Sequence, residues 1–449
     1  MFIRPENWKK LSAKERQELR LNSWKSVDEM QFASDEARAR FQKHTQMVED
    51  VLLLKKPARV PILPWIGVYP AEYGGITVEE AMYDYEKLGQ AFTKFNNDFM
   101  PDNLASAALM GPGKVFDMLD YKIYRWPGHG TPPDTSYQCI EGEYMKAEEY
   151  DQFIADPSSY FMRYYLPRSF GALAPWQLMP PFTNIVELPF VGLSLIPVGI
   201  PDVQQAFKTY LEAGLATMEW ISAVGPIDGG NTATLGLPST MGSFTKAPFD
   251  TIGDTMRGTR GIMLDMYRQP QKLLEALDRL VPIAIEMGVS NADGGNNPFV
   301  FIPLHKGADG FMSNRDFEKF YWPTLKAVLL GLIDEGTVPY LFVEGGYNQR
   351  LDTIADPDIP AASAIWMFDQ TDMKEAKKKL EGWACFGGNV PASLLKTGKP
   401  EEVANYVKRL IDDVAGDGGY IMANGAVLDD TTPENLHAMI DTAKEYGVY

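Results

Sequence analysis

The chain is predicted to be an α/β protein of the (β/α)8 (TIM) barrel class, with the barrel over residues 51–449. Short apolar runs alternate with amphipathic segments about eight times from residue 59 onward, which is the order of elements in such a barrel. Several amphipathic segments open with Asp, Ser, Thr, Asn or Pro, and several close on Gly, as helices do. A doubly wound open sheet is the second choice, because no GxGxxG follows the first run.

Eight apolar runs are the predicted strands, and each is short enough and apolar enough to be buried in a parallel sheet. Helical patterns such as PDVQQAFKTYLEAGLATMEWISAV lie between them. The predicted strands cover residues 60–68, 98–102, 232–238, 298–304, 338–343, 363–368, 382–387 and 419–424.

Two parts of the chain fall outside this alternation. Residues 1–50 are rich in charge and helical in pattern, so we expect an N-terminal helical extension. Residues 120–185 mix Pro, Gly and aromatic residues, which predicts a hairpin-bearing insertion in a βα loop. Insertions after a barrel strand lie on the catalytic face, so we expect this one to form a lid.

The composition excludes several classes of function. With 42 Lys and Arg against 60 Asp and Glu, the net charge of −18 repels nucleic acid and anionic lipid. No stretch approaches the ~20 apolar residues of a membrane span, and the start has no leader-like apolar run. Two cysteines are too few for a disulfide framework, so we expect a cytoplasmic protein. The sequence does not fix the oligomeric state, and a homodimer is compatible with it.

The strand ends supply the candidate chemistry, because side chains there face the active site of a barrel. His305, Glu344 and Asp369 each follow a predicted strand, and Cys385 lies within another. One His, one Glu and one Cys can form a three-ligand zinc site with an open fourth position. The hypothesis is therefore a zinc ion held by His305, Glu344 and Cys385, with Glu344 and Asp369 as catalytic residues.

Each of these residues also has a structural alternative. Cys385 can be a small buried apolar side chain, which is the commoner state of a free cysteine. Glu344 can cap the next loop or pair with Arg350, and His305 can bond a backbone carbonyl. Asp369 can replace one of the ligands or orient His305 from behind.

Aromatic residues after the first strand indicate a substrate pocket. Trp65 and Tyr69 are its predicted walls, with Phe244 as a further candidate. His129 lies in the motif PGHG on the predicted lid, where it can contact the substrate or simply form a turn.

Five segments together resemble the uroporphyrinogen decarboxylase superfamily, over about residues 50–449. Within it the chain looks closer to the corrinoid-dependent methyltransferases of anaerobic O-demethylase systems, and the resemblance itself implies a (β/α)8 barrel. The segments are KKPARVPILPWIGVYPAEYGG, KAPFDTIGDTMRGTRGIMLDMYRQP, GADGFMSNRDFEKFYWPTLK, CFGGNVPASLLKTGKPEEV and GGYIMANGAVLDDTTPENLHAMI.

Two departures from the family patterns narrow the function. The decarboxylase binds a substrate rich in carboxylates through arginines after its first strand, whereas no Arg occurs between Arg59 and Arg125 here. Thiol-methylating members carry His-x-Cys and a further Cys, but the matching positions here are Phe342, Val343, Glu344 and Ala426. A carboxylate in place of thiolate leaves zinc a harder Lewis acid, which suits an ether oxygen.

The resemblance therefore implies methyl transfer from a methoxylated aromatic to the cobalt of a corrinoid protein, with zinc polarising the ether oxygen. The corrinoid is expected on a partner, because the chain has no cobalamin-binding motif. One alternative is a metal-free decarboxylase of a smaller acid, with Asp369 or Asp98 stabilising charge. The other is a barrel that binds without catalysis.

Overall fold

The computed structural model describes residues 1–449 and is built on a six-stranded parallel sheet. Every neighbouring pair of its strands is parallel, in the order β4-β5-β6-β7-β8-β9. All six residues of β6 are buried, as expected for a sheet covered on both faces. The strands are β4 (Ser243–Phe244), β5 (Phe299–Leu304), β6 (Val338–Val343), β7 (Ile365–Phe368), β8 (Cys385–Gly387) and β9 (Tyr420–Ile421).

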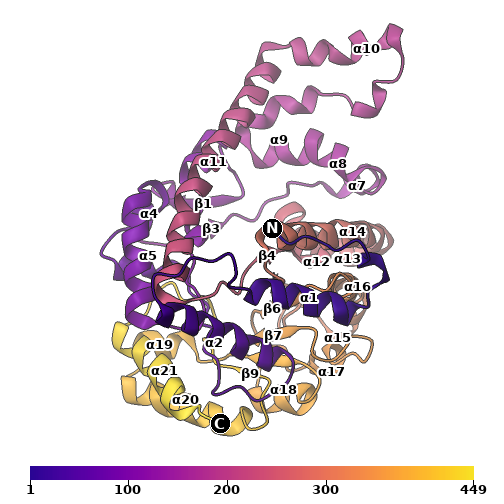
Figure 1. Cartoon of the computed structure of the whole chain (residues 1–449). Coiled ribbons are helices and arrows are strands. Elements are labelled where there is room, and N and C mark those ends of the chain that lie inside the picture. Colours follow the sequence, from indigo (N-terminus) through magenta and orange to yellow (C-terminus); the bar gives the residue numbers. More distant parts are fainter.

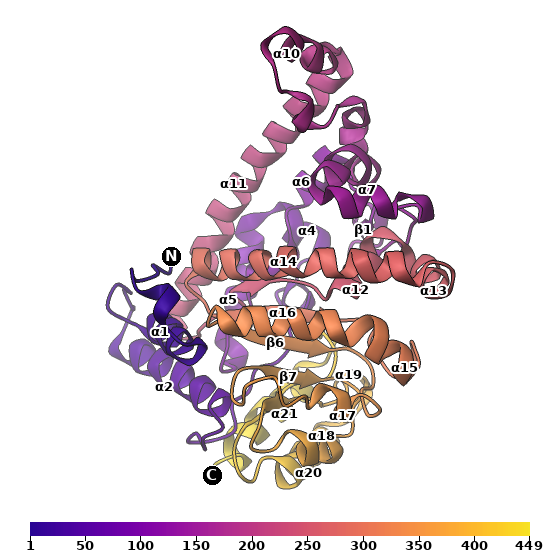
Figure 2. The ribbon, with the colours of Figure 1, turned by 90° about the vertical axis from the view of Figure 1, so that its right-hand side faces the viewer.

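Helices separate the strands along the chain and pack on the outer face of the sheet (Figure 2). This confirms the parallel α/β part of the prediction. In chain order they are α12 (Pro248–Asp250), α13 (Gly258–Arg268), α14 (Pro270–Gly295), α15 (Asn314–Asp316), α16 (Trp322–Asp334), α17 (Leu351–Ile354), α18 (Met373–Leu380), α19 (Ala392–Thr397), α20 (Pro400–Val414) and α21 (Pro433–Tyr446).

Two further segments are joined by backbone hydrogen bonds beyond β9. The backbone N–H of Leu63 donates to Met422, and Ile62 forms a parallel bridge with the same residue. The backbone N–H of Asp102 donates to Ile62 (2.9 Å), and that of Leu104 donates to Pro238, five residues before β4 (2.9 Å). Backbone hydrogen bonds therefore lead from β9 through residues 60–66 and 101–105 back to the chain that enters β4.

The predicted strand at residues 232–238 is wrong. Residues up to Leu235 form the last turns of helix α11 (Pro201–Leu235), which ends where Gly236 adopts a φ of 68°. Val224 and Asn231, seven residues apart, are buried on one face, so the helical period continues through this segment and overrides its β-propensity. The strand of the sheet that follows α11 is β4, which begins at Ser243.

The predicted strand at 98–102 is displaced in a similar way. Helix α5 (Tyr85–Phe99) takes its first two residues, and Met100 ends the helix in the left-handed conformation. The other helices of this region are α3 (Tyr69–Tyr73), α4 (Val78–Tyr83) and α6 (Gly113–Leu119).

The N-terminal residues form the expected helices, α1 (Ala13–Lys25) and α2 (Asp35–Leu52). They pack where the strands begin: Trp24 of α1 meets the ring of Phe299, the first residue of β5, at 5.0 Å. Val51 and Leu52 of α2 share the same apolar cluster. The two helices therefore close the amino-terminal end of the sheet. None of the helices in the structure combines the length and apolar character that a membrane span requires.

The region between α6 and β4 projects from the body as an arm (Figure 1). Its long axis is α11, with α10 at the far end, and it continues well past residue 185, where the predicted insertion ends. Pro226 lies within α11 without ending it. The other elements are β1 (Tyr124–Pro127), β2 (Gly130–Thr131), β3 (Gln138–Cys139), α7 (Tyr150–Ala155), α8 (Pro157–Tyr160), α9 (Leu166–Ser169) and α10 (Leu188–Leu195).

A partly buried ion pair lies at the base of this arm. Arg168 donates to both carboxylate oxygens of Glu149, at 2.7 and 2.6 Å, and the hydroxyl of Tyr160 donates to the same carboxylate at 2.8 Å. Burial raises the pKa of Glu149, but the hydrogen bonds from Arg168, the backbone of Lys146 and Tyr160, with the charge of Arg168, together outweigh burial and lower the pKa to about 2. Folding is therefore linked to the ionisation of Glu149.

We expect Glu149→Gln to lower the free energy of unfolding by about 1–3 kcal/mol at pH 7. A lowered carboxylate pKa stabilises the fold above pH 4.5, and this contribution is lost as the pH falls toward 2. Urea unfolding of the wild type and of Glu149→Gln should therefore show a gap between their free energies of unfolding, and this gap should narrow below pH 4.5. Glu148→Gln is the matched control, since the neighbouring Glu148 is exposed and should show no gap. A gap that is independent of pH would contradict the linkage.

Candidate active site

Three polar side chains lie at one level, directly after three neighbouring strands. Leu304, Val343 and Phe368 pair across β5, β6 and β7, so the next residues, His305, Glu344 and Asp369, follow at the same height. Side chains alternate along a strand, so these three continue the face that carries Phe301, Phe342 and Met367. This face, called the inner face below, holds the apolar cluster over α1 and α2.

His305 is the centre of the site. Its Nδ1 donates to Oδ2 of Asp254 at 2.6 Å, and its Nε2 lies 3.6 Å from Oε1 of Glu344. Asp254 comes from residues 251–256, which follow β4 and α12. The imidazole is therefore held between two carboxylates, one on each ring nitrogen.

A buried carboxylate, that of Asp250, fixes the position of the His305 backbone. Asp250 is fully buried and accepts hydrogen bonds from the backbone N–H of His305 (3.1 Å) and Lys306 (2.9 Å). The hydroxyl of Tyr321 donates to it at 2.6 Å. These three bonds satisfy a carboxylate that has no solvent, and they fix the chain at the end of β5.

Two lysines balance part of the negative charge. Nζ of Lys246 lies 2.5 Å from Oδ2 of Asp254, and Nζ of Lys306 lies 3.1 Å from Oδ1. Lys306 also donates to the hydroxyl of Thr259 at 2.7 Å. Asp254 thus carries three cationic or proton-donating partners, while Glu344 has only His305.

The carboxylates set the protonation of the site. Burial lowers the pKa of His305, but the Asp254 hydrogen bond and the charges of Asp250 and Glu344 outweigh burial and raise it above its ordinary value. Burial also raises the pKa of Asp254, yet its bonds to His305 and Lys246 hold that pKa well below its usual range. For Glu344, burial and nearby carboxylates raise the pKa. The surrounding carboxylates therefore favour the protonated form of His305.

Aromatic rings form the inner face beneath these polar groups. The ring of Trp65 lies 5.3 Å from Phe301 and 4.8 Å from Phe342. Phe244, at the end of β4, is 39% exposed and lies 6.2 Å from Phe301. The side chain of Asn424 fixes the backbone of Trp65 through two hydrogen bonds of 2.9 Å. The predicted pocket residue Trp65 thus lies in the layer below Glu344.

The arm reaches this site through its hairpin. Nζ of Lys306, which pairs with Asp254, also lies 3.4 Å from Oε1 of Glu141, two residues after β3. The arm is therefore in contact with the charged groups of the site.

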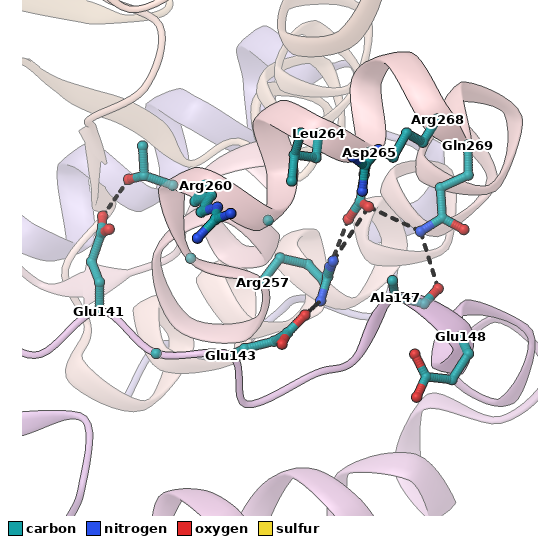
Figure 3. A pocket seen from close by; sticks show the side chains of 14 residues that line it. Glu141, Glu143, Ala147, Glu148, Arg257, Arg260, Leu264, Asp265, Arg268 and Gln269 are labelled. Carbon is teal, nitrogen blue, oxygen red and sulfur yellow. Dashed lines mark hydrogen bonds and ion pairs between the residues drawn. The ribbon is translucent and has the colours of Figure 1, made fainter.

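Figure 3 shows the contact between the next residues of the arm and α13. Arg257 makes ion pairs with Glu143 and Asp265 and donates to the backbone carbonyl of Met145 at 2.7 Å. A cleft of about 750 Å³ lies between these residues, with Arg260 and Glu148 on its walls. Arg257 thus fastens the arm beside the site.

Cys385 does not join the predicted zinc ligands. It is the first residue of β8 and pairs with Ile365, four residues before Asp369. At ~3.3 Å per residue it lies on the order of 13 Å below the level of His305 and Glu344. It is fully buried in the apolar cluster of the inner face, and burial alone raises its pKa. The structural alternative for Cys385, a small core side chain, is the one that fits.

The remaining residues fit a metal ion only in part. Catalytic zinc takes three protein ligands at ~2.0–2.3 Å. The structure brings two donors together, His305 Nε2 and Glu344 Oε1, and Asp254 supports the histidine as an outer carboxylate does. No group of three His, Cys, Asp or Glu side chains is arranged to hold a metal. The predicted three-residue set is therefore not assembled.

Two predicted pocket residues lie elsewhere. Tyr69 is 2% exposed and packs against Tyr73 and Phe95 in the main core. His129 pairs with Asp117 at 3.0 Å and stacks on Trp126, away from the strand ends.

The proposed alternatives for two carboxylates also fail. Arg350 does not pair with Glu344, because it is fully buried and donates to the carbonyls of Gly307 and Met312. Asp98 lies on α5, where it accepts from Tyr73 and Lys94.

Sequence reasoning missed Lys246, Asp250, Asp254 and Lys306. For the first three residues the sequence did contain a signal. The spacing of four residues in KAPFDTIGD puts Lys246, Asp250 and Asp254 on one side of a helical turn. The strand before them was placed too early, so this segment was not recognised as a strand end. Asp369, in contrast, was found, and it borders a cavity of about 970 Å³ with Asn389 and Ala426.

The fold and this site define a parallel α/β protein with an acidic site at the carboxyl ends of its strands. Residues 232–446, which contain the whole six-stranded sheet, match the family model described as uroporphyrinogen decarboxylase (URO-D). The predicted resemblance to that superfamily is thereby confirmed.

Relatives support the same assignment at a distance. The uroporphyrinogen decarboxylase of Methylococcus capsulatus is 25% identical and that of Acinetobacter baylyi 24% identical, each over 211 residues. Each match covers 45% of this chain and 57% of the relative, so it spans little more than half of their length. A methyltransferase from Methanosarcina mazei shares the fold, with a TM-score of 0.57 and 14% identity over 91% of this chain and 98% of that one.

Proposed function

We propose that this chain is a methyltransferase built on a closed (β/α)8 barrel, which moves a methyl group from a methoxylated aromatic to the cobalt of a corrinoid protein. The observation that carries the proposal is His305 Nε2, which faces Glu344 above an aromatic floor. The hydrogen bonds that lead from β9 back to β4 support closure of the barrel. The structural likeness to a methyltransferase supports the same fold.

The charges of the site favour a neutral donor. Four carboxylates, of Asp250, Asp254, Glu344 and Asp369, stand against two lysines, and both lysines already pair with Asp254. A substrate with several carboxylates would meet net repulsion here. The exposed ring of Phe244 and the half-buried ring of Phe301, with the buried Trp65 beneath Phe301, instead offer apolar surface against which an aryl group can pack. A methoxylated arene matches both features.

The chain's own residues then complete the cleavage of the ether. As the methyl group leaves, the bonding pair stays on the aryl oxygen, and the proton on His305 Nε2 passes to that oxygen to give the phenol. Asp254 holds the ring and keeps it protonated until then. Glu344 holds the imidazole on its Nε2 side and orients the methyl donor. The reduced corrinoid of the partner supplies the nucleophile.

Zinc, expected from the resemblance, stays a prediction. His305 Nε2 and Glu344 Oε1 could occupy two of its positions. A histidine bound to zinc through Nε2 carries no proton there, so in a zinc-bound form the metal, as a Lewis acid on the ether oxygen, would take the place of proton donation by His305. The metal content of the purified protein tests it.

We expect the protein to convert cob(I)alamin to methylcobalamin with at least one methoxyarene and to release an equal amount of the phenol. Absorbance spectra follow the cobalamin, and chromatography follows the phenol. Heat-inactivated protein is the control for the uncatalysed reaction. No phenol from a broad panel of donors would contradict the proposal.

The second candidate is decarboxylation of a smaller acid. The match to the URO-D family and the two lysines beside Asp254, which could bind one carboxylate, favour it. Release of carbon dioxide from such an acid, without phenol from any ether, would establish this activity instead.

A further inference from the structure

The outer part of the arm carries an unusual concentration of exposed apolar side chains. Half of the large apolar residues that are exposed in the whole chain lie within residues 178–221. They are Leu178, Phe182, Ile185, Val186, Leu188, Phe190, Leu193, Leu195, Ile196, Tyr210, Leu211, Leu215, Met218 and Ile221. With about half or more of each exposed, they present on the order of 1,000 Å² of apolar surface, beyond the few hundred Å² usual for a monomer.

The exposed face of α11 has the spacing of a helix-pairing seam. One face of the helix, including Val203, Ala206 and Ala213, packs on the chain itself. On the exposed side, steps of four, three, four, three and four residues connect Leu211, Leu215, Met218, Ser222, Gly225 and Gly229. Such a repeat keeps one stripe of a helix facing another helix over several turns.

This seam is complementary to itself. Its large residues lie before position 220 and its small residues lie after it, at equal steps. If a second α11 lies antiparallel with the two-fold axis at position 220, Leu211 faces Gly229, Leu215 faces Gly225 and Met218 faces Ser222. A Cβ placed on Gly225 or Gly229 would meet nothing within 4 Å in the single chain, so both positions are open to receive a side chain. Helix-interior glycines destabilise a helix by about 1 kcal/mol, so close approach of a partner gives them a purpose.

We infer that α11 is the centre of a two-fold homodimer, in which the arms of two copies pair antiparallel through this seam. Each α10 then lies beside the base of the partner's arm, because α10 is at the far end of α11 (Figure 1). If the exposed apolar residues of 178–196 are covered together with the seam, each copy contributes on the order of 1,000 Å², which reaches the size of a stable homodimer interface.

The charge of the arm argues against a lipid surface as the occupant. Among residues 178–221 the charged residues are four acidic ones, Glu187, Asp202, Glu212 and Glu219, and a single basic one, Lys208. Interfacial helices that bind membranes combine an apolar face with Lys and Arg. A second copy of the same apolar seam needs no such basic complement.

The test is the mass of the full chain by light scattering at about 1 and 50 µM. Wild type should have twice the 50.2 kDa of one chain. Leu215→Glu should raise the dimer dissociation constant about a hundredfold or more, because it buries a charge opposite an apolar seam. Tyr267→Glu, at a 72% exposed aromatic on α13, should leave the mass unchanged.

A size exchange makes the test specific for the pairing. Gly229→Leu should also yield monomers, although a Cβ at this position meets nothing within 4 Å in the single chain and leucine has a higher helix propensity than glycine. The double variant Leu211→Ala with Gly229→Leu should restore the dimer, since the large residue then meets the small one again. A monomeric wild type, a monomer that binds phosphatidylcholine vesicles, or a dimer that survives Leu215→Glu would each overturn the inference.

Discussion

Replacing Glu344 with glutamine is expected to lower the rate of methyl transfer by about a hundredfold or more, while the protein stays folded. Glutamine keeps the shape of the side chain but removes the charge that faces His305 Nε2 at 3.6 Å. Glu344 is only partly buried, and its side chain has no other partner, so the fold should tolerate the change. If zinc is bound, its content should fall together with the rate. The phenol-release assay and metal analysis measure both.

Cys385→Ser is the matched control for this prediction. The thiol lies at the start of β8 within the apolar cluster, so a hydroxyl there should lower the free energy of unfolding by about 1–3 kcal/mol. Rate and zinc content should stay near those of the wild type. If Cys385→Ser loses the metal while Glu344→Gln keeps it, the site has been assigned to the wrong end of the strand.

The sheet was largely predictable because most of its strands are uninterrupted apolar runs. The runs that became β5, β6 and β7 are each followed directly by a polar residue, and this boundary identified His305, Glu344 and Asp369. The alternation of side chains along parallel strands then places all three on one face. The sequence therefore held the core of the candidate site.

The predictions that were wrong depended on where a strand begins or on contacts between distant parts of the chain. GWACFG is apolar throughout, so its strand was predicted over residues 382–387 with Cys385 in its second half, yet the strand begins at Cys385 itself. Tyr69 and His129 are aromatic or titratable, but their sequence neighbours give no sign of which face they occupy. The length of α11 was hidden because its last turns, TATL, have the composition of a strand.

The charge of Asp254 should matter nearly as much as Glu344, through a different effect. Asp254→Asn removes the carboxylate that bonds His305 Nδ1 at 2.6 Å and also leaves Lys246 and Lys306 without their common partner. Loss of such an orienting carboxylate typically lowers activity 10–100-fold, and we expect that range. The pKa of His305 should fall as well, because the hydrogen bond and the negative charge both raise it.

The pH profile of methyl transfer distinguishes this role from a merely structural one. If His305 donates the proton, the rate declines as the pH rises through its pKa, so in Asp254→Asn the decline should begin at a lower pH. Lys246→Met is the matched variant: it removes a positive charge beside Asp254 and keeps the carboxylate on His305, so its decline should begin at a higher pH. Equal shifts in the same direction would contradict proton donation by His305. A lower rate with an unchanged profile in Asp254→Asn would limit the carboxylate to holding the ring in place.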